Sequence, residues 1–210
     1  MKNSIEKLKY HEKNELDEWL DLDENESKKF LQEIIEFSRE NFDQIKQYCL
    51  NTIPTEFSSL SIIYEAYSEH SSDFNQFLFE EIQRVVHLAK TNKIDPECLE
   101  ILTDIDTENI YTDSIDIYIQ IMNFLTSNLS LRNDKYLNIQ LLEVISWYII
   151  ELDEDHNISE SKVWFQKIKV LAERGSWSVR KKAREILNDS DPSNVSNFFS
   201  LFRRIKRIFN

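Results

Sequence analysis

Residues 173–187 read ERGSWSVRKKAREIL, and this stretch decides the fold that the sequence predicts. It contains Gly175, the single glycine of the chain, followed by a serine and an amphipathic segment. We interpret it as a corner between two helices. One helix ends at Arg174, Gly175 adopts the left-handed conformation that closes many helices, and Ser176 caps the next one. The stretch therefore predicts consecutive helices that pack antiparallel.

The rest of the chain has the same character. One Gly and three Pro in 210 residues leave little material for hairpin turns or phosphate-binding loops. Apolar residues recur at three- and four-residue spacing almost throughout, which is typical of amphipathic helices. We expect an all-α fold of about ten helices, joined by short connections that favour antiparallel neighbours. The expected ranges are 4–20, 26–50, 56–69, one opened by an Asp73 cap, a short one from Pro96 capped by Asp95, 113–128, 134–152, 159–174, 177–188 and 194–209.

We expect residues 1–210 to form a single α-helical domain. Residues 113–128 and 134–152 are the most apolar segments and should form the centre of the core. Residues 194–210 carry Phe, Leu and Ile on one side and Arg and Lys on the other. This basic amphipathic segment is expected to be a capping helix that closes the stack.

The segment SWSVRKKAREIL at 176–187 resembles the second helix of a HEAT-type repeat. Val179, Arg180, Ala183 and Leu187 occupy the positions of the V-R-x-x-A-x-x-x-L pattern. The resemblance implies a HEAT-like stack of helical hairpins, most HEAT-like over 113–188, in which Arg180 reaches an acidic group between repeats. Earlier pairs lack the Val-Arg signature, so an irregular helical bundle is the alternative.

The sequence offers no catalytic or metal-binding motif. Three acidic clusters open like the calcium loop of an EF-hand, but each lacks the Gly at position six and the Glu at position twelve. We interpret them as solvated loops between helices. The four histidines are scattered without metal-ligand spacing, and the glycine-dependent nucleotide motifs are absent. We therefore expect a protein that is not an enzyme and uses no cofactor and no metal.

Both cysteines, Cys49 and Cys98, lie in apolar periodic segments and are expected to be buried, reduced thiols. The amino terminus lacks the apolar core of a secretory signal, and no run of 18 apolar residues occurs. These features together favour a cytoplasmic location.

The aromatic residues and His87 give further expectations. Trp19, Trp147 and Trp164 fall in helical register with apolar residues and should be buried, whereas Trp177 lies beside a corner and should be the most exposed. His87 lies on an otherwise apolar helix, which favours a partly buried structural histidine.

Charge is distributed unevenly along the chain. Residues 1–159 carry a net charge of −20 and residues 160–210 carry +7. An acidic surface speeds encounter with a basic protein, and the chain is similar in size, charge and expected architecture to small acidic bacterial immunity proteins that neutralise nuclease toxins. This resemblance implies an antitoxin that covers a basic toxin. By counting antiparallel helices, we expect three acidic clusters to form one partner-binding rim: Asp21, Asp23, Glu24, Glu26, Asp106, Glu108, Asp153, Glu154 and Asp155.

Other functions stay open at this point. Solubility alone would account for the charge, and a HEAT-like adaptor or scaffold would need no single partner. A nucleic-acid protein would use the basic residues of 180–184 and 203–207, but the acidic remainder would repel a polyanion, so no nucleic acid is expected. A membrane-surface role would use 194–210, for which a capping helix is favoured.

Overall fold

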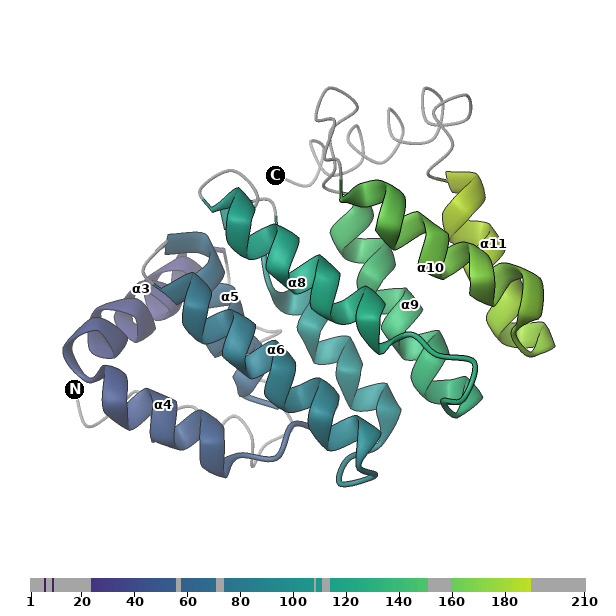
Figure 1. Ribbon diagram of the computed structural model, residues 1–210. Coiled ribbons are helices and arrows are strands. Elements are labelled where there is room, and N and C mark those ends of the chain that lie inside the picture. The colour runs from purple at the N-terminus through teal and green to yellow at the C-terminus, as the bar shows by residue number, and fades with distance from the viewer. Residues whose placement is uncertain are drawn as a thin grey trace. The chain divides into compact units, whose positions relative to one another are not determined.

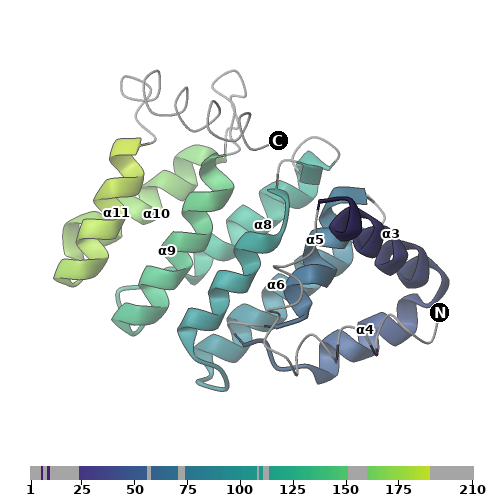
Figure 2. The same ribbon diagram turned by 180° about the vertical axis from the view of Figure 1, so that it is seen from behind.

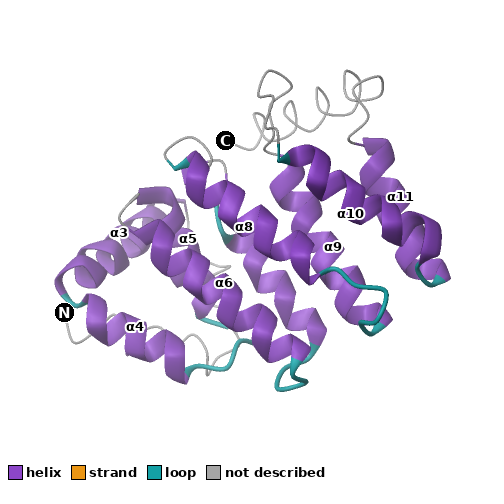
Figure 3. Cartoon of the chain, in the orientation of Figure 1, coloured by secondary structure: helices purple, strands orange, loops and turns teal. Residues whose placement is uncertain are grey.

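The computed structural model describes Glu6, Lys9 and residues 24–55, 58–70, 74–107, 109–110, 114–150 and 160–189. Every regular element in these ranges is a helix, which confirms the all-α prediction (Figures 1 and 3). The elements are α3 (Glu24–Glu40), α4 (Phe42–Asn51), α5 (Leu60–His70), α6 (Asn75–Lys90), the 3-10 helix η2 (Pro96–Asp104), α8 (Ile115–Asn128), α9 (Lys135–Ile150), α10 (Ser161–Arg174) and α11 (Trp177–Asp189). The expected helices over 4–20 and 194–209 and the Asp73 cap lie outside the described residues.

The chain divides into two compact units, Met1–Ile121 and Met122–Asn210, with the boundary inside α8. Unit 1 carries a net charge of −16 and unit 2 a net charge of +3. The single domain over 1–210 and its HEAT-like part over 113–188 stay predictions.

In unit 1, α5 packs against α3, α6 and η2, and η2 also packs against α6. These contacts bury aliphatic side chains completely, among them Ile34, Ile45, Ile63, Leu78 and Val85. The amphipathic spacing of each helix directs these residues toward a common core.

The helix expected over 26–50 is two helices, so that prediction was wrong. It breaks at Asn41, whose φ of −133° and ψ of 38° are not helical. The Asn41 side chain donates from Nδ2 to the carbonyl of Phe37 at 3.0 Å, a local bond that competes with regular helical bonding. The break positions Phe42 against the rings of Phe74 and Phe77, at centroid distances of 5.7 and 5.8 Å.

A buried charge network joins three helices of unit 1. Arg84 on α6 donates from Nη2 to the Glu81 carboxylate at 2.8 Å and from Nη1 to the carbonyl of Thr52, directly after α4, at 3.1 Å. Tyr64 on α5 donates to the same carboxylate at 2.9 Å. Burial, reinforced by the Glu81 charge, raises the pKa of the Tyr64 hydroxyl well above its usual value. Each polar group has a partner, which offsets the cost of removing the charges from water.

The predicted start of the fifth helix is confirmed. Asp95 Oδ1 accepts a hydrogen bond from the backbone N–H of Glu97 at 3.0 Å, and Pro96 stands at the first position. The segment winds as a 3-10 helix, in which side chains three residues apart lie directly above one another.

In unit 2, α11 packs against both α10 and α9. Figure 2 shows α9 and α11 side by side in front of α10, with both helices beginning at the lower end of the view. The indole of Trp164 is fully buried, and its Nε1 donates to Asn123 Oδ1 on α8 at 2.7 Å. Lys182 of α11 forms an ion pair with Glu143 of α9. The resemblance to HEAT repeats implied such a pair for Arg180, and Lys182 forms it between these two helices.

The corner at Gly175 is present, but its predicted backbone conformation was wrong. Gly175 has φ −68° and ψ 174°, which is extended backbone open to any residue. The reason for glycine is space, because a Cβ here would lie 2.7 Å from the carbonyl oxygen of Leu171 and 3.0 Å from Val179 Cγ1. Among the described residues, the non-glycine position with positive φ is Asn92, at 55° after α6.

Burial corrects several single-residue predictions. Trp164 is buried and Trp177 is exposed, as predicted, but Trp147 is also exposed. Because α9 is apolar on nearly all sides, its sequence does not show which side lacks a neighbour. His87 is exposed and Cys98 is half-buried, whereas Cys49 is fully buried as expected. Neither cysteine is part of a disulfide, and Trp19 lies outside the described residues.

Candidate functional site

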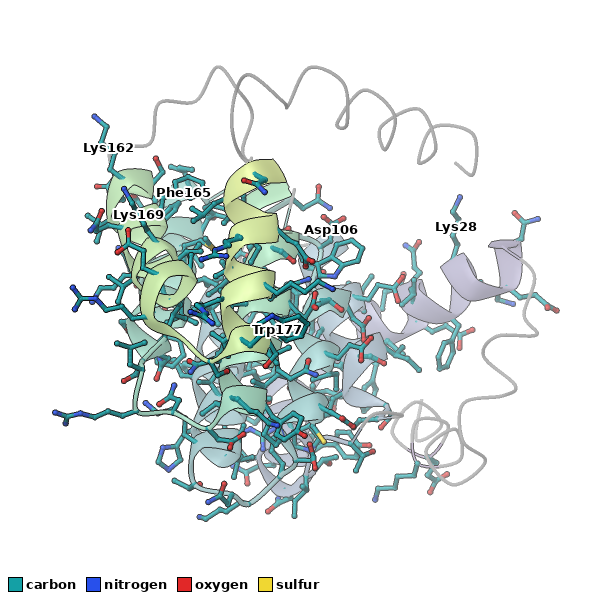
Figure 4. The ribbon with its side chains drawn as sticks, turned by 90° about the vertical axis from the view of Figure 1, so that its right-hand side faces the viewer. Lys28, Asp106, Lys162, Phe165, Lys169 and Trp177 are labelled. Carbon is teal, nitrogen blue, oxygen red and sulfur yellow. The ribbon has the colours of Figure 1, made fainter. Side chains whose placement is uncertain are left out.

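Three of the nine predicted partner-binding residues belong to the described part of the chain. Glu24 and Glu26 lie in the first turn of α3, where Glu26 is exposed, and Asp106 follows η2. Figure 4 shows Asp106 apart from Lys28 of α3. The remaining six lie outside the described residues: Asp21, Asp23, Glu108, Asp153, Glu154 and Asp155.

The helix count behind the predicted rim also changes. The segment between Glu26 and Asp106 was expected to hold four helices. Its described residues form five elements, because the helix expected over 26–50 breaks at Asn41. Strict alternation of direction then sends these two acidic groups to opposite edges. A rim that joins all three clusters stays a prediction, and its counting argument no longer supports it.

Asp106 has a local structural task. Its Oδ2 accepts a hydrogen bond from Asn109 Nδ2 at 3.1 Å, and its backbone N–H donates to Ser68 Oγ of α5 at 2.9 Å. The residue is half-buried. It therefore fixes the turn after η2 against α5.

The exposed carboxylates next to this turn were not among the predicted site residues. Glu97, Glu100 and Asp104 all lie on η2 and are exposed. Glu97 and Glu100 are three residues apart, so the 3-10 geometry aligns them along one side of the helix. Among the described residues, none of the three forms an ion pair with Lys, Arg or His. We call these three residues the η2 carboxylates.

Burial and a neighbouring charge both act on the carboxyl of Asp104. Partial burial of the carboxyl, and then repulsion from Glu100, raises its pKa to about 6, although the residue as a whole keeps substantial solvent contact. Glu80 on α6 shows the opposite case: hydrogen bonds from Lys46 and Gln76 lower its pKa. The two carboxyls differ first in burial, which is larger at Asp104, and then in their neighbours, because Glu80 has the Lys46 ammonium group at 3.1 Å. Among the described residues, the η2 carboxylates thus form a negative charge that no ion pair compensates.

A sequence signal for this surface exists. Residues 94–121 contain eight Asp and Glu residues and no Lys or Arg. The predicted rim rests instead on the denser run at 15–26 and on the loop clusters. The absence of cations over a long segment is the better indicator, because compensation by neighbours along the chain is then impossible.

The described residues show no other chemical centre. No group of three or more His, Cys, Asp or Glu side chains in them is placed to hold a metal ion. In the same part of the chain, the helices are too short or too polar to cross a bilayer. Compared with protein-family models, curated proteins and solved structures, the chain gives no match.

Proposed function

We propose that this protein is a protein-binding module that neutralises a basic protein, an immunity protein against a toxin such as a nuclease, and that unit 1 provides the acidic binding surface. The observation that carries the proposal is that the η2 carboxylates are exposed and that none of them forms an ion pair with a cation among the described residues. Repulsion from Glu100 adds to burial in raising the pKa of Asp104.

The physical argument concerns what such a pair prefers to bind. Two adjacent carboxylates without a cation weaken the folded protein, and a Lys or Arg side chain from a partner would relieve this repulsion. A basic partner therefore gains more at the η2 carboxylates than at carboxylates already paired, such as Glu80 with Lys46. A nuclease presents a basic groove for phosphate, and an acidic protein seated in it excludes the nucleic acid.

The proposal includes a non-enzymatic role and a basic protein as partner. The predicted carboxylates Asp153, Glu154 and Asp155 stay part of it as a second acidic contact, contributed by unit 2. Reversing the charge of these three residues together is expected to lower the association rate strongly at low salt. At high salt the same change should lower the rate much less, because salt screens the attraction between the charges.

The test begins with the full chain as bait in a lysate of its native host, with bound proteins identified by mass spectrometry. A basic nuclease domain as the main captured protein supports the proposal. Nucleic acid, lipid or many unrelated proteins would favour a nucleic-acid, membrane or scaffold role instead.

The captured partner is then purified, and its affinity is measured by calorimetry as pH changes. Because the partner favours the charged form of Asp104, binding should release protons, and affinity should rise as pH increases through about 6. The double variant Glu100→Gln/Asp104→Asn should bind the partner at least tenfold more weakly at neutral pH, which corresponds to a loss of about 1.4 kcal/mol in binding free energy. Its affinity should no longer rise as the pH increases through about 6.

The matched control is Glu36→Gln/Glu40→Gln, which removes the same charge from exposed positions one turn apart on α3. If the control weakens binding as much as the η2 variant, net charge alone drives association. If the η2 variant binds like the unmodified chain, the η2 carboxylates are not the binding surface.

A further inference from the structure

Unit 2 exposes three large aromatic side chains on two neighbouring helices. Tyr136 and Trp147 on α9 are 57% and 50% exposed, and Trp177 on α11 is 73% exposed. Most other apolar side chains of these helices are buried, including Leu141, Tyr148, Val179 and Ala183. Aromatic side chains that remain in water cost free energy and are typical anchors of protein interfaces.

The aromatic residues belong to two parallel stripes. On α9, Tyr136, Gln140, Glu143 and Trp147 follow a spacing of four, three and four residues, which keeps them on one side of a helix. On α11, Trp177, Lys181 and Glu185 follow a spacing of four. We call these seven residues the aromatic face.

Contacts within unit 2 bring the two stripes together. Lys182 of α11 reaches Glu143 of α9, which fixes the two helices side by side at this level, as Figure 2 shows. Figure 4 shows Trp177 beside the first turn of α11, away from the α10 side chains Lys162, Phe165 and Lys169.

The carboxylates of the aromatic face are paired with lysines. Lys182 is paired with Glu143, and Lys181 lies 3.8 Å from Glu185. Lys135 of α9 lies over the Tyr136 ring, with its Nζ 4.6 Å from the ring centroid. The face therefore fits a partner that carries alternating charges between aromatic anchors.

We propose that the occupant of the aromatic face is a second copy of this chain, related by a two-fold axis that lies across α9 and α11. Such an axis sets each helix antiparallel to its own copy, and each contact then occurs twice. Lys181 and Glu185 lie two residues on either side of Ala183, so rotation places Lys181 opposite the partner subunit's Glu185. The alternation along α11 is thus complementary to itself.

The same rotation suits α9. Tyr136 and Trp147 are equidistant from the middle of the helix, between Leu141 and Leu142, so Tyr136 faces the partner subunit's Trp147. The Lys182–Glu143 pair sets the two stripe centres at levels that differ by less than three residues, or about 4 Å at 1.5 Å per residue. A single two-fold axis can therefore relate both stripes to their copies, because Lys, Glu and Trp side chains are long enough to span the difference in level. This contact lies in unit 2 and does not depend on the proposed binding surface of unit 1.

The test uses charge exchange in the full chain, followed by sedimentation equilibrium. Wild-type protein is expected to be a dimer in the micromolar range. Lys181→Glu alone and Glu185→Lys alone each place like charges opposite one another twice per dimer, and each should raise the dimer Kd at least tenfold. An equimolar mixture of these two variants should form a heterodimer, because at both contacts a carboxylate of one subunit then faces an ammonium group of the other. The double variant Lys181→Glu/Glu185→Lys should dimerise like wild type.

Restoration by mixing separates this proposal from a folding defect, since a chain that cannot fold is not rescued by another variant. The matched control is Lys169→Glu on the exposed side of α10, which should leave the dimer Kd unchanged within twofold. Trp177→Ala should weaken the dimer at least tenfold at an unchanged melting temperature.

Four results would overturn the proposal. The first is a wild-type chain that stays monomeric up to about 1 mM, the weak limit for a specific contact. The second is a dimer whose Kd neither charge reversal changes, and the third is a pair of single variants that do not associate on mixing. The fourth is a monomeric chain that binds a labelled single-stranded oligonucleotide and loses this binding when Trp177 is replaced. The last result would assign the aromatic face to base stacking.

Discussion

Replacing Gly175 by Ala tests why the chain has its glycine at the α10–α11 corner. The extended backbone at this position accepts any residue, so the cost arises from contact alone. The added Cβ would lie 2.7 Å from the Leu171 carbonyl oxygen, which belongs to the last turns of α10 and already accepts the Gly175 N–H at 2.9 Å. Either this hydrogen bond lengthens or α11 moves away from α10.

The magnitude follows from two opposing effects. Overpacking of one carbon typically costs about 1–3 kcal/mol. Loss of glycine freedom in the unfolded chain gives back about 0.4–1 kcal/mol. The clash involves backbone, which has little room to yield, so we expect a net loss of about 1–2 kcal/mol. For a chain of this size, that corresponds to a melting temperature lower by about 2–8 °C.

Circular dichroism with heating and with urea measures this loss, and two further variants identify its cause. Gly175→Asn should be at least as destabilised as Gly175→Ala, because a larger side chain meets the same oxygen. Val179→Ala should cost less in the Gly175→Ala background than in the wild-type chain, since Val179 Cγ1 is the second contact at 3.0 Å. A Gly175→Asn variant more stable than Gly175→Ala would refute the steric argument, because Asn tolerates left-handed backbone better than Ala.

Two other predictions concern unit 1. Glu81→Gln removes a buried carboxylate that balances half-buried Arg84, and it should lower the free energy of unfolding by about 3 kcal/mol. Glu80→Gln, in an exposed pair, should cost about 1 kcal/mol or less in urea unfolding. Equal losses would show that the network around Glu81 contributes no more than a surface pair. Burial raises the pKa of the Cys49 thiol and shields it, so a thiol reagent should modify half-buried Cys98 first and Cys49 only on unfolding. Peptide mass spectrometry measures the order, and labelling of Cys49 in the folded protein would contradict it.

The fold class was predictable because it depends on features that the sequence carries locally. Scarcity of Gly and Pro and a steady three- to four-residue apolar period leave little but helices. The start of η2 was readable for the same reason, since Asp95 and Pro96 act on their own neighbours. Its 3-10 winding was not, because Asp95 and Pro96 mark the start of a helix without distinguishing a 3-10 helix from an α-helix.

The errors arose where a residue's role depends on a distant neighbour. The apolar period runs through Asn41 without interruption, so the sequence does not show that the helix breaks there. The break places the Phe42 ring against the rings of Phe77 on α6 and of Phe74, which directly precedes α6. Trp147 is apolar like the rest of α9, and only the packing of α11 decides that its side stays open.

The candidate site divides in the same way. Net charge predicted an acidic surface in the first part of the chain, and unit 1 carries it. The members could not be predicted from cluster density, because a carboxylate's state depends on the nearest cation in space. Lys46 compensates Glu80 from another helix, 34 residues away in sequence, whereas the η2 carboxylates have no such neighbour among the described residues.

The hydrogen bond from Trp164 to Asn123 gives unit 2 an internal optical label. Its indole is shielded from solvent, so its fluorescence should be blue-shifted and resistant to iodide quenching until the helices separate. Trp147 and Trp177 lie in water and should emit further to the red, where iodide quenches them. In a Trp19→Phe background, one sample can therefore report separately on the integrity of the core and on the occupancy of the surface.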